Sequence, residues 1–205
     1  FHVVYYTLLD KFAHGEIKKM IVQMPPQHGK SEGSSRKLPA FMLGLNPDTK
    51  ICIGSYAATI ARDFNRDVQR IIDTPKYREI FPKTFLNGSN VVTMANTYLR
   101  NSDVIEMVGH KGSLRVVGRG GALTSKTVDV MIMDDVYKDY SEGNSPIVRN
   151  AAWKWYTTVV KKRLHNKSQE LIVFTRWHEE DLIGKIEKGG EKIIDIKSWD
   201  SIKNI

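Results

Sequence analysis

The sequence predicts an α/β fold, a three-layer sandwich in which helices cover both faces of a mostly parallel sheet. Two observations support this prediction. Short apolar runs alternate along the chain with segments of helical periodicity, which is the order of strand–helix–strand units. A chain of 205 residues is long enough for one substantial domain and short for two. We therefore expect a single domain over residues 1–205.

The expected strands are apolar runs bounded by turn signals or helical patterns. In chain order they are 19–24, 50–56, 128–133, 170–174 and 193–196. The runs 97–99 and 104–107 are typical of antiparallel strands. Residues 118–121 spell Gly-Arg-Gly-Gly, which predicts a tight, exposed loop before the third of the main strands.

Four helices are expected between and after these strands. Pro39 should kink or split the first helix, because proline removes a backbone donor. In the second, Ile60, Phe64 and Val68 share one face. Pro146 stands at the first position of the third, where proline is favoured. The expected ranges are 31–45, 59–73, 146–163 and 179–189.

Composition is that of a globular protein with an excess of basic charge. The net charge of +8 favours a polyanionic partner, although solvated helix faces are the simpler explanation for part of it. No apolar run approaches the roughly 20 residues that span a bilayer, so no membrane partner is predicted. Cys52 stands alone in an apolar run, which excludes an intramolecular disulfide framework and favours a cytosolic location. Because the chain begins with Phe1, we expect it to be a piece of a longer protein.

A phosphate-binding loop is predicted where the first strand runs into the first helix. Residues 24–31 spell Met-Pro-Pro-Gln-His-Gly-Lys-Ser. In such a loop, backbone N–H groups surround the phosphates, Lys30 neutralises their oxygens and the Ser31 hydroxyl can bind Mg²⁺. Met24 stands where the usual pattern has its first glycine, so the motif is incomplete.

A second strand adds the acids that such a loop needs. Residues 128–135 are an apolar run that ends in Asp134 and Asp135. A carboxylate at the end of a strand can orient Mg²⁺, and this role falls to Asp134. Thr175 ends the strand expected beside this one, where a hydroxyl can sense a terminal phosphate. Loop and acids together predict a nucleoside triphosphatase; helix-capping acids and a strand-end threonine are the simpler alternatives.

At these residues the chain resembles a known family, the ATPase domain of the large terminase subunit of tailed bacteriophages. The blocks that carry the resemblance are the deviant phosphate loop 25–31, the segment 55–68, the glycine-rich and acidic segments 118–124 and 131–135, and the segments 153–156 and 175–184. The resemblance covers about residues 1–200. It implies a P-loop ATPase of the additional-strand type that binds ATP and Mg²⁺ and drives double-stranded viral DNA into a procapsid.

The resemblance also implies partners and a location. These are the portal protein, the small terminase subunit and further copies of the chain in a ring on the procapsid, in the host cell cytoplasm. A C-terminal nuclease domain is expected in the full protein, and no segment of this sequence represents it.

The expected site follows from the motif and the resemblance together. Asp135 stands where related motors usually have a glutamate that polarises the attacking water, and its side chain is one methylene shorter. The expected nucleotide-binding residues are Pro26, Gln27, His28, Gly29, Lys30, Ser31, Glu32 and Thr175, and the expected metal ligands are Ser31 and Asp134.

An arginine is expected to act on the γ-phosphate from outside the loop. Some family members carry an arginine inside it, whereas this chain has Pro25, Pro26 and Gln27 there. Arg119 is the candidate, because glycines on both sides would leave its guanidinium mobile enough to reach a neighbouring subunit. Contact with DNA phosphate, or simple solvation of the loop, is the alternative. Arg115 and Arg176 are rival candidates.

Two other functions remain open from the sequence. A helicase-like or remodelling ATPase would share this sheet, but the acidic strand lacks a helicase-type continuation and no second motor domain is present in the sequence. A non-catalytic nucleic-acid-binding module would explain Met24 and Asp135 as lesions of a decayed loop. Hydrolysis measured with and without Mg²⁺ separates the classes.

Overall fold

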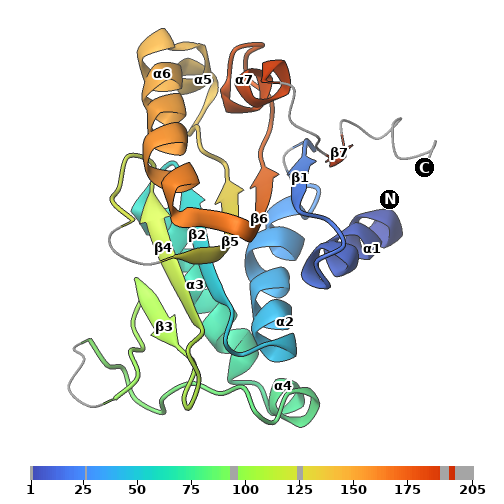
Figure 1. Cartoon of the computed structure of the whole chain (residues 1–205), viewed down its shortest axis with the longest axis vertical. Helices are drawn as coiled ribbons and strands as arrows, with labels where there is room; N and C mark the ends of the chain where they lie inside the picture. The colour runs from blue at the N-terminus through green and yellow to red at the C-terminus, as the bar shows by residue number, and fades with distance from the viewer. Residues whose placement is uncertain (1, 26, 93–96, 124–126, 190–193, 197–205) are drawn as a thin grey trace.

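The computed structural model describes residues 2–25, 27–92, 97–123, 127–189 and 194–196. Its centre is a seven-stranded sheet with the order β3-β4-β2-β5-β6-β1-β7 (Figure 1). All neighbouring strands are parallel except β3 and β4. The strands are β1 (Lys19–Val22), β2 (Lys50–Ser55), β3 (Val104–Glu106), β4 (Ser113–Gly118), β5 (Val128–Asp134), β6 (Leu164–Val173) and β7 (Ile194–Ile196).

Helices pack on both faces of this sheet, which confirms the predicted three-layer α/β fold. One face is covered by α1 (His2–Ala13), the π-helical segment η1 (Glu32–Lys37), α2 (Leu38–Leu45), α3 (Ala58–Ile72) and α4 (Pro75–Ile80). The other is covered by α6 (Pro146–Trp155), the π-helical η2 (Tyr156–Val160) and α7 (Leu182–Lys188). The short α5 (Tyr140–Asn144) precedes α6, and the 3-10 turn η3 (Lys161–Arg163) follows η2.

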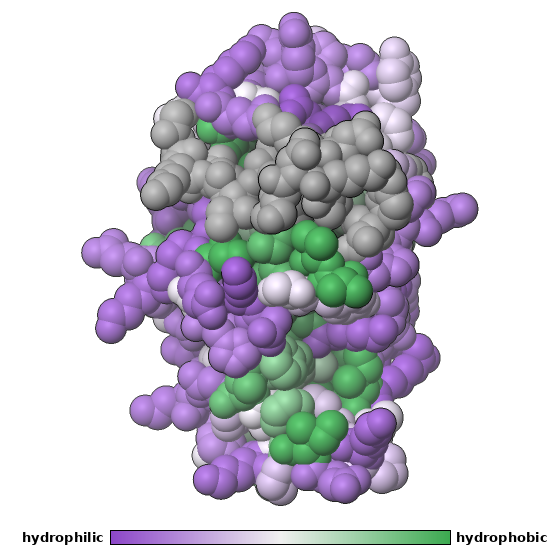
Figure 2. Space-filling view, turned by 90° about the vertical axis from the view of Figure 1, so that its right-hand side faces the viewer, coloured by the Kyte–Doolittle hydropathy of each residue, from purple (hydrophilic) through white to green (hydrophobic). Residues whose placement is uncertain are grey.

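Apolar side chains on alternate strand positions supply two separate cores. Ile51 and Ile53 of β2 point into the first, with Val68 of α3, whereas Cys52 points into the second, with Trp155 of α6. Central parallel strands are therefore apolar on both faces, as their unbroken apolar runs predict. Figure 2, which looks onto the right-hand side of Figure 1, shows a mostly polar face with patches of apolar side chains between the polar ones.

Several predicted elements differ in the structure. Residues 97–99 form no strand; the neighbouring Arg100 makes only isolated bridges to Val91 and Ile105. Gly118 ends β4 and lies outside the glycine loop that follows. The first predicted helix runs without a break through Pro39. Its first part is π-helical instead.

Two further boundaries were wrong. The last helix begins at Leu182, after a turn capped by the Asp181 side chain, which accepts a hydrogen bond from the Gly184 N–H at 3.0 Å. Strand β6 begins six residues earlier than predicted, at Leu164 rather than at position 170. Its first half is polar and lies outside the cores, so an apolar pattern could not mark it. Within the described residues, no helix has the length and apolar character needed to cross a bilayer.

Candidate active site

The carboxyl ends of β1, β5 and β6 point to the same edge of the sheet (Figure 1). The loop after β1 contains two left-handed residues, Gln27 with a φ of 65° and Gly29 with a φ of 76°. Glycine adopts this conformation without strain, and it turns the chain from the strand into the helix that begins at Lys30. Pro26, an expected nucleotide-binding residue, lies outside the described residues.

Lys30 is fixed at both its backbone and its side chain. Its carbonyl accepts hydrogen bonds from the Tyr5 hydroxyl at 2.6 Å and from the Ser34 hydroxyl at 2.7 Å. Its Nζ donates to Thr175 Oγ1 at 2.9 Å and lies 3.4 Å from Asp135 Oδ1. Lys30, Asp135 and Thr175, which were predicted from separate parts of the sequence, thus lie together. They follow β1, β5 and β6, whose carboxyl ends lie at the same edge of the sheet.

Ser31 and Asp134 form the second half of the site. The Ser31 hydroxyl donates to Asp134 Oδ1 at 3.1 Å, and the Ser35 hydroxyl donates to Asp134 Oδ2 at 2.5 Å. Asp134 is fully buried. Burial, and after it the charge of Asp135, raises the pKa of Asp134 to about 7, while the hydrogen bonds from Ser35 and Ser31 and the charge of Lys30 oppose this rise.

These residues fit a magnesium ion by the chemistry of their donor atoms. A serine hydroxyl and a carboxylate are hard oxygen ligands, and Mg²⁺ in nucleotide sites uses one or two carboxylates together with phosphate oxygens and water. The described residues contain no cluster of three or more His, Cys, Asp or Glu side chains that could hold a metal. A metal at this place would therefore share its coordination with the phosphates.

Asp135 directs its carboxylate out of the sheet into an open space. Its φ of 45° lies in the left-handed region, which aspartate tolerates better than most residues. Two backbone hydrogen bonds of 2.9 Å fix this turn: the Asp135 N–H donates to the Val173 carbonyl, and the Tyr56 N–H donates to the Asp135 carbonyl. The Asp135 side chain is 41% exposed, so a water molecule can reach it.

The space in front of Lys30 is a cavity of about 490 Å³. Seven residues predicted for the site or its loop line it: Gln27, Gly29, Lys30, Ser31, Glu32, Asp135 and Thr175. His28 is exposed and does not line it, and Asp134 lies beneath it. Four lining residues were not predicted for the site: Arg36, Tyr137, Lys138 and Trp177.

Sequence reasoning also missed Ser35 and Tyr5. Ser35 follows Ser31 by four residues, which places both hydroxyls on one side of the helix, and this spacing could have identified it. Tyr5 comes from α1, a helix that we did not predict, and no motif links it to the loop.

Arg119 is held inside the chain. Its Nη1 donates to the Val136 carbonyl at 2.7 Å and to Glu142 Oε2 at 2.8 Å, and its guanidinium lies 5.9 Å from the centre of the Tyr137 ring. The side chain is only 16% exposed. The expectation of a mobile guanidinium is therefore not met in this conformation, and Arg119 does not line the cavity.

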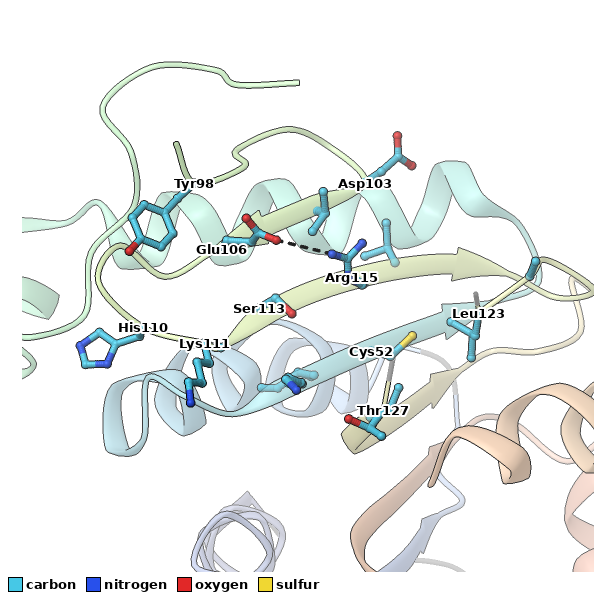
Figure 3. A pocket seen from close by; sticks show the side chains of 17 residues that line it. Cys52, Tyr98, Asp103, Glu106, His110, Lys111, Ser113, Arg115, Leu123 and Thr127 are labelled. Atoms are coloured by element: carbon cyan, nitrogen blue, oxygen red, sulfur yellow. Dashed lines mark ion pairs between the residues drawn. The ribbon is translucent and has the colours of Figure 1, made fainter. Parts of the chain in front are cut away.

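The rival arginines are also paired away from the cavity. Arg176 contacts Asp181 at 3.0 Å and Glu187 at 3.1 Å. Arg115 lies 3.6 Å from Glu106, within a larger cavity of about 680 Å³ over the first halves of β2 and β4 (Figure 3). That second cavity contains none of the predicted site residues.

Comparison with known proteins identifies the family of this chain. A family model described as the N-terminal part of the terminase large subunit, T4likevirus type, matches residues 21–201. The chain belongs to this family. The predicted resemblance to the ATPase domain of bacteriophage large terminases, the DNA-packaging proteins, is thereby confirmed. A search of the curated proteins gave no match.

Solved terminase structures share the fold at low sequence identity. The large terminase ATPase domain of Thermus phage P74-26 matches with a TM-score of 0.54 at 17% identity over 78% of this chain. An arginine-to-alanine mutant of that domain gives 0.55 at 16% identity over 82%. The large terminase of bacteriophage HK97 gives 0.54 at 13% identity over 88%.

The chain spans less than two thirds of each of these structures. It covers 60% of the P74-26 domain, 64% of the mutant domain and 35% of the HK97 protein.

Proposed function

We propose that this terminase chain is a Mg²⁺-dependent ATPase whose hydrolysis drives double-stranded viral DNA into a procapsid. The observation that supports it best is the meeting of Lys30, Asp135 and Thr175 at one cavity, above the Ser31–Asp134 pair. Family membership supports the packaging role. A decayed, non-catalytic loop would have no need of this arrangement.

In the proposed reaction, water attacks the terminal phosphorus of ATP, the bond to the leaving ADP oxygen breaks, and phosphate is released. Asp135 orients the water and accepts its proton, because its carboxylate is exposed to the cavity beside Lys30. Lys30 and the backbone N–H groups of the loop stabilise the charge on the phosphates. Thr175 positions the Lys30 ammonium and senses the terminal phosphate.

Ser31 and Asp134 would hold Mg²⁺, which would supply positive charge to the phosphates. Ser35 fixes the second oxygen of the Asp134 carboxylate, so that the first oxygen faces Ser31 and the phosphates. A shorter base than the usual glutamate is compatible with this site, since the left-handed turn at Asp135 carries its carboxylate toward Lys30.

Arg119 is proposed to act on the nucleotide of a neighbouring copy in a ring. This role requires that it exchange its contacts with Glu142 and the Val136 carbonyl for a phosphate. The proposed partners are double-stranded DNA, the portal protein and the small terminase subunit, in the host cell cytoplasm at the procapsid. A nuclease domain elsewhere in the full protein belongs to the same proposal.

Hydrolysis with and without Mg²⁺, followed by a DNA translocation assay, tests this function. A translocating ATPase should hydrolyse ATP only with Mg²⁺ and should move along duplex DNA without separating its strands. Strand separation would instead favour the helicase-like alternative, and absence of hydrolysis in the presence of DNA would favour the non-catalytic module.

A further inference from the structure

We propose that Arg36 is a cis-acting arginine of the nucleotide cavity, and that its terminal nitrogens contact the γ-phosphate of bound ATP. This inference rests on the proposed function and adds a residue to it. Arg36 lies in η1, five residues after Ser31 on the same continuous helix. Of the arginines in the described ranges, it alone lines the cavity that Lys30 and Asp135 share.

The Arg36 guanidinium is held by one edge and by one face. Its Nε donates to Asp67 Oδ2 of α3 at 2.7 Å, and Glu32 Oε2 lies 3.9 Å from the same nitrogen. The guanidinium carbon lies 4.9 Å from the centre of the Phe64 ring, a distance at which cation and ring attract. These contacts fix the plane of the group, and a fixed plane loses less entropy when it binds a ligand.

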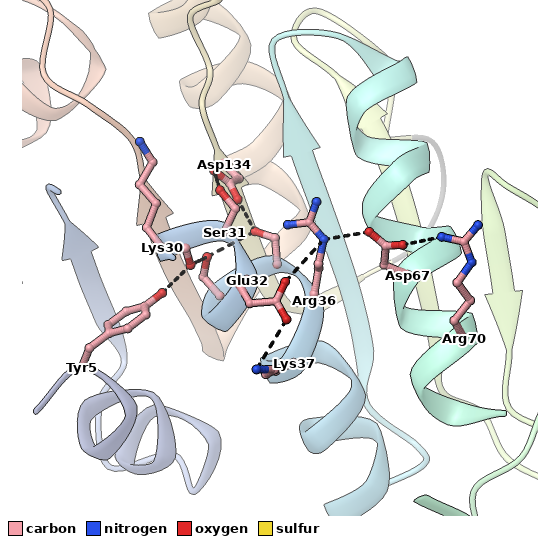
Figure 4. Close-up of polar contacts among 11 residues, drawn as sticks. Tyr5, Lys30, Ser31, Glu32, Arg36, Lys37, Asp67, Arg70 and Asp134 are labelled. Atoms are coloured by element: carbon pink, nitrogen blue, oxygen red, sulfur yellow. Dashed lines mark hydrogen bonds and ion pairs between the residues drawn. The ribbon is translucent and has the colours of Figure 1, made fainter. Parts of the chain in front are cut away.

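The other edge of the guanidinium is available for a ligand. Among the described residues, neither terminal nitrogen of Arg36 makes a hydrogen bond or ion pair with the protein. Figure 4 shows these nitrogens turned away from Asp67, toward the side on which Ser31 and Asp134 lie. Two parallel N–H donors on a rigid plane match the geometry of two phosphate oxygens.

The position of Arg36 in the cavity favours contact with the γ-phosphate rather than with the other phosphates. The triphosphate must extend from the loop N–H groups toward Asp135, because the attacking water lies between that carboxylate and the γ-phosphate. Arg36 and Asp135 both line this cavity. Lys30 already lies beside Asp135, so a further cation in the cavity would stabilise the additional negative charge that ATP has relative to ADP.

Arg70 provides a matched control. It pairs with the other oxygen of the same carboxylate, Asp67 Oδ1, at 2.8 Å, yet it is exposed and does not line the cavity. Removal of Arg70 deletes the contact of Asp67 with an exposed arginine, whereas removal of Arg36 deletes its contact with the arginine that lines the cavity.

The experiment is calorimetric titration of the full chain, with Mg²⁺, using ADP and a non-hydrolysable ATP analogue. Arg36→Ala should weaken binding of the analogue by about 10-fold or more, the scale of one charge-assisted hydrogen-bonded contact, and change ADP binding less than about twofold. Arg70→Ala should leave both affinities within about twofold. If Arg36→Ala does not fold, Arg36→Gln, which keeps the length without the charge, should show the same selective loss.

Two outcomes would overturn the inference. Unchanged binding of both nucleotides by a folded Arg36 variant, or an equal loss for both, would make Arg36 a structural link between η1 and α3. Failure of the unaltered chain to bind either nucleotide is a different result, because it would refute the proposed function itself.

Discussion

The Ser31 hydroxyl and the Asp134 carboxylate meet at 3.1 Å although 103 residues separate them in the chain. Asp134 is the last residue of β5, and Ser31 lies at the start of the helix that follows β1 and its loop. Strand β6 lies between β5 and β1 in the sheet. A parallel α/β sheet brings the carboxyl ends of its strands to one edge, which is where its ligands bind.

Lys30→Ala should abolish Mg²⁺-ATP hydrolysis. The Lys30 ammonium lies 2.9 Å from Thr175 Oγ1 and 3.4 Å from Asp135, where its charge can stabilise the phosphates. Turnover should fall by about 10²-fold or more. A phosphate-release assay measures this, and circular dichroism checks that the fold is retained. Full activity in the variant would remove the phosphate-loop assignment.

Ser35→Ala should raise the Mg²⁺ concentration needed for half-maximal binding of the ATP analogue. Without the 2.5 Å hydrogen bond to Oδ2, the Asp134 carboxylate loses one of its two hydroxyl donors and is less well oriented. We expect a shift of about 10-fold, the scale of one hydrogen bond to a charged group. Ser34→Ala is the control, since Ser34 is equally buried but donates to the Lys30 carbonyl. Equal shifts in the two variants would contradict the role of Ser35.

The stability of the nucleotide-free chain should depend on pH through Asp134. Burial raises the pKa of Asp134 from the ordinary value of 3.8 to about 7 in the folded state. The folded state then binds more protons than the unfolded state between these values, so Asp134 favours folding fully below about pH 4 and loses this contribution as the pH rises to about 7. Thermal melting from pH 5 to pH 8 measures it, and Asp134→Asn should remove this part of the dependence. An unchanged profile in Asp134→Asn would contradict the raised pKa.

Binding of Mg²⁺ should strengthen as the pH rises, because the metal requires the ionised form of the Asp134 carboxylate. Analogue binding in the presence of Mg²⁺ should weaken as the pH falls below about 7. Titration of the unaltered chain at pH 6 and pH 8 tests this. Tighter Mg²⁺-dependent binding at pH 6 would rule out Asp134 as the metal-linked group.

From the sequence we predicted five residues that the structure brings together at the candidate site, but not the residues that contact them. Lys30, Ser31, Asp134, Asp135 and Thr175 each follow an apolar strand, and a parallel sheet brings strand ends together. Ser35 and Arg36 lie inside a helix, where the pattern predicted an ordinary α-helical face. In the structure this segment is π-helical, which changes the direction of its side chains.

Strand β4 (Ser113–Gly118) was not predicted from the sequence. Strand β4 contains Ser113 and Arg115 within six residues, so its apolar alternation is interrupted where the chain borders the second cavity. The ion pair of Arg119 with Glu142 was equally hidden, because 23 residues separate the partners. The glycines on either side of Arg119 predicted a mobile side chain. Only the tertiary contacts with Glu142 and the Val136 carbonyl show that the Arg119 guanidinium is fixed.

A mixing experiment tests the proposal that Arg119 acts on the nucleotide of a neighbouring subunit. Arg119→Ala chains keep an intact nucleotide cavity, and Lys30→Ala chains keep the arginine. Under conditions where the chains assemble, mixtures should recover part of the ATPase activity that each variant lacks alone, since an arginine supplied to a neighbour can accelerate hydrolysis by roughly 10³-fold. Glu142→Gln, which releases Arg119 from its ion pair, should not lower the activity of the assembled chain. No recovery at any mixing ratio would exclude a role in trans.

The central claim is that Asp135 activates water in a cavity where Lys30 and the Ser31–Asp134 pair hold Mg²⁺-ATP. Single-turnover hydrolysis by the unaltered chain, by Asp135→Asn and by Asp134→Asn tests it most directly, with analogue binding measured on the same samples. We predict that Asp135→Asn keeps binding and loses about 10²-fold or more in rate, whereas Asp134→Asn loses Mg²⁺-dependent binding. Equal rates and equal binding in the two variants would contradict the claim.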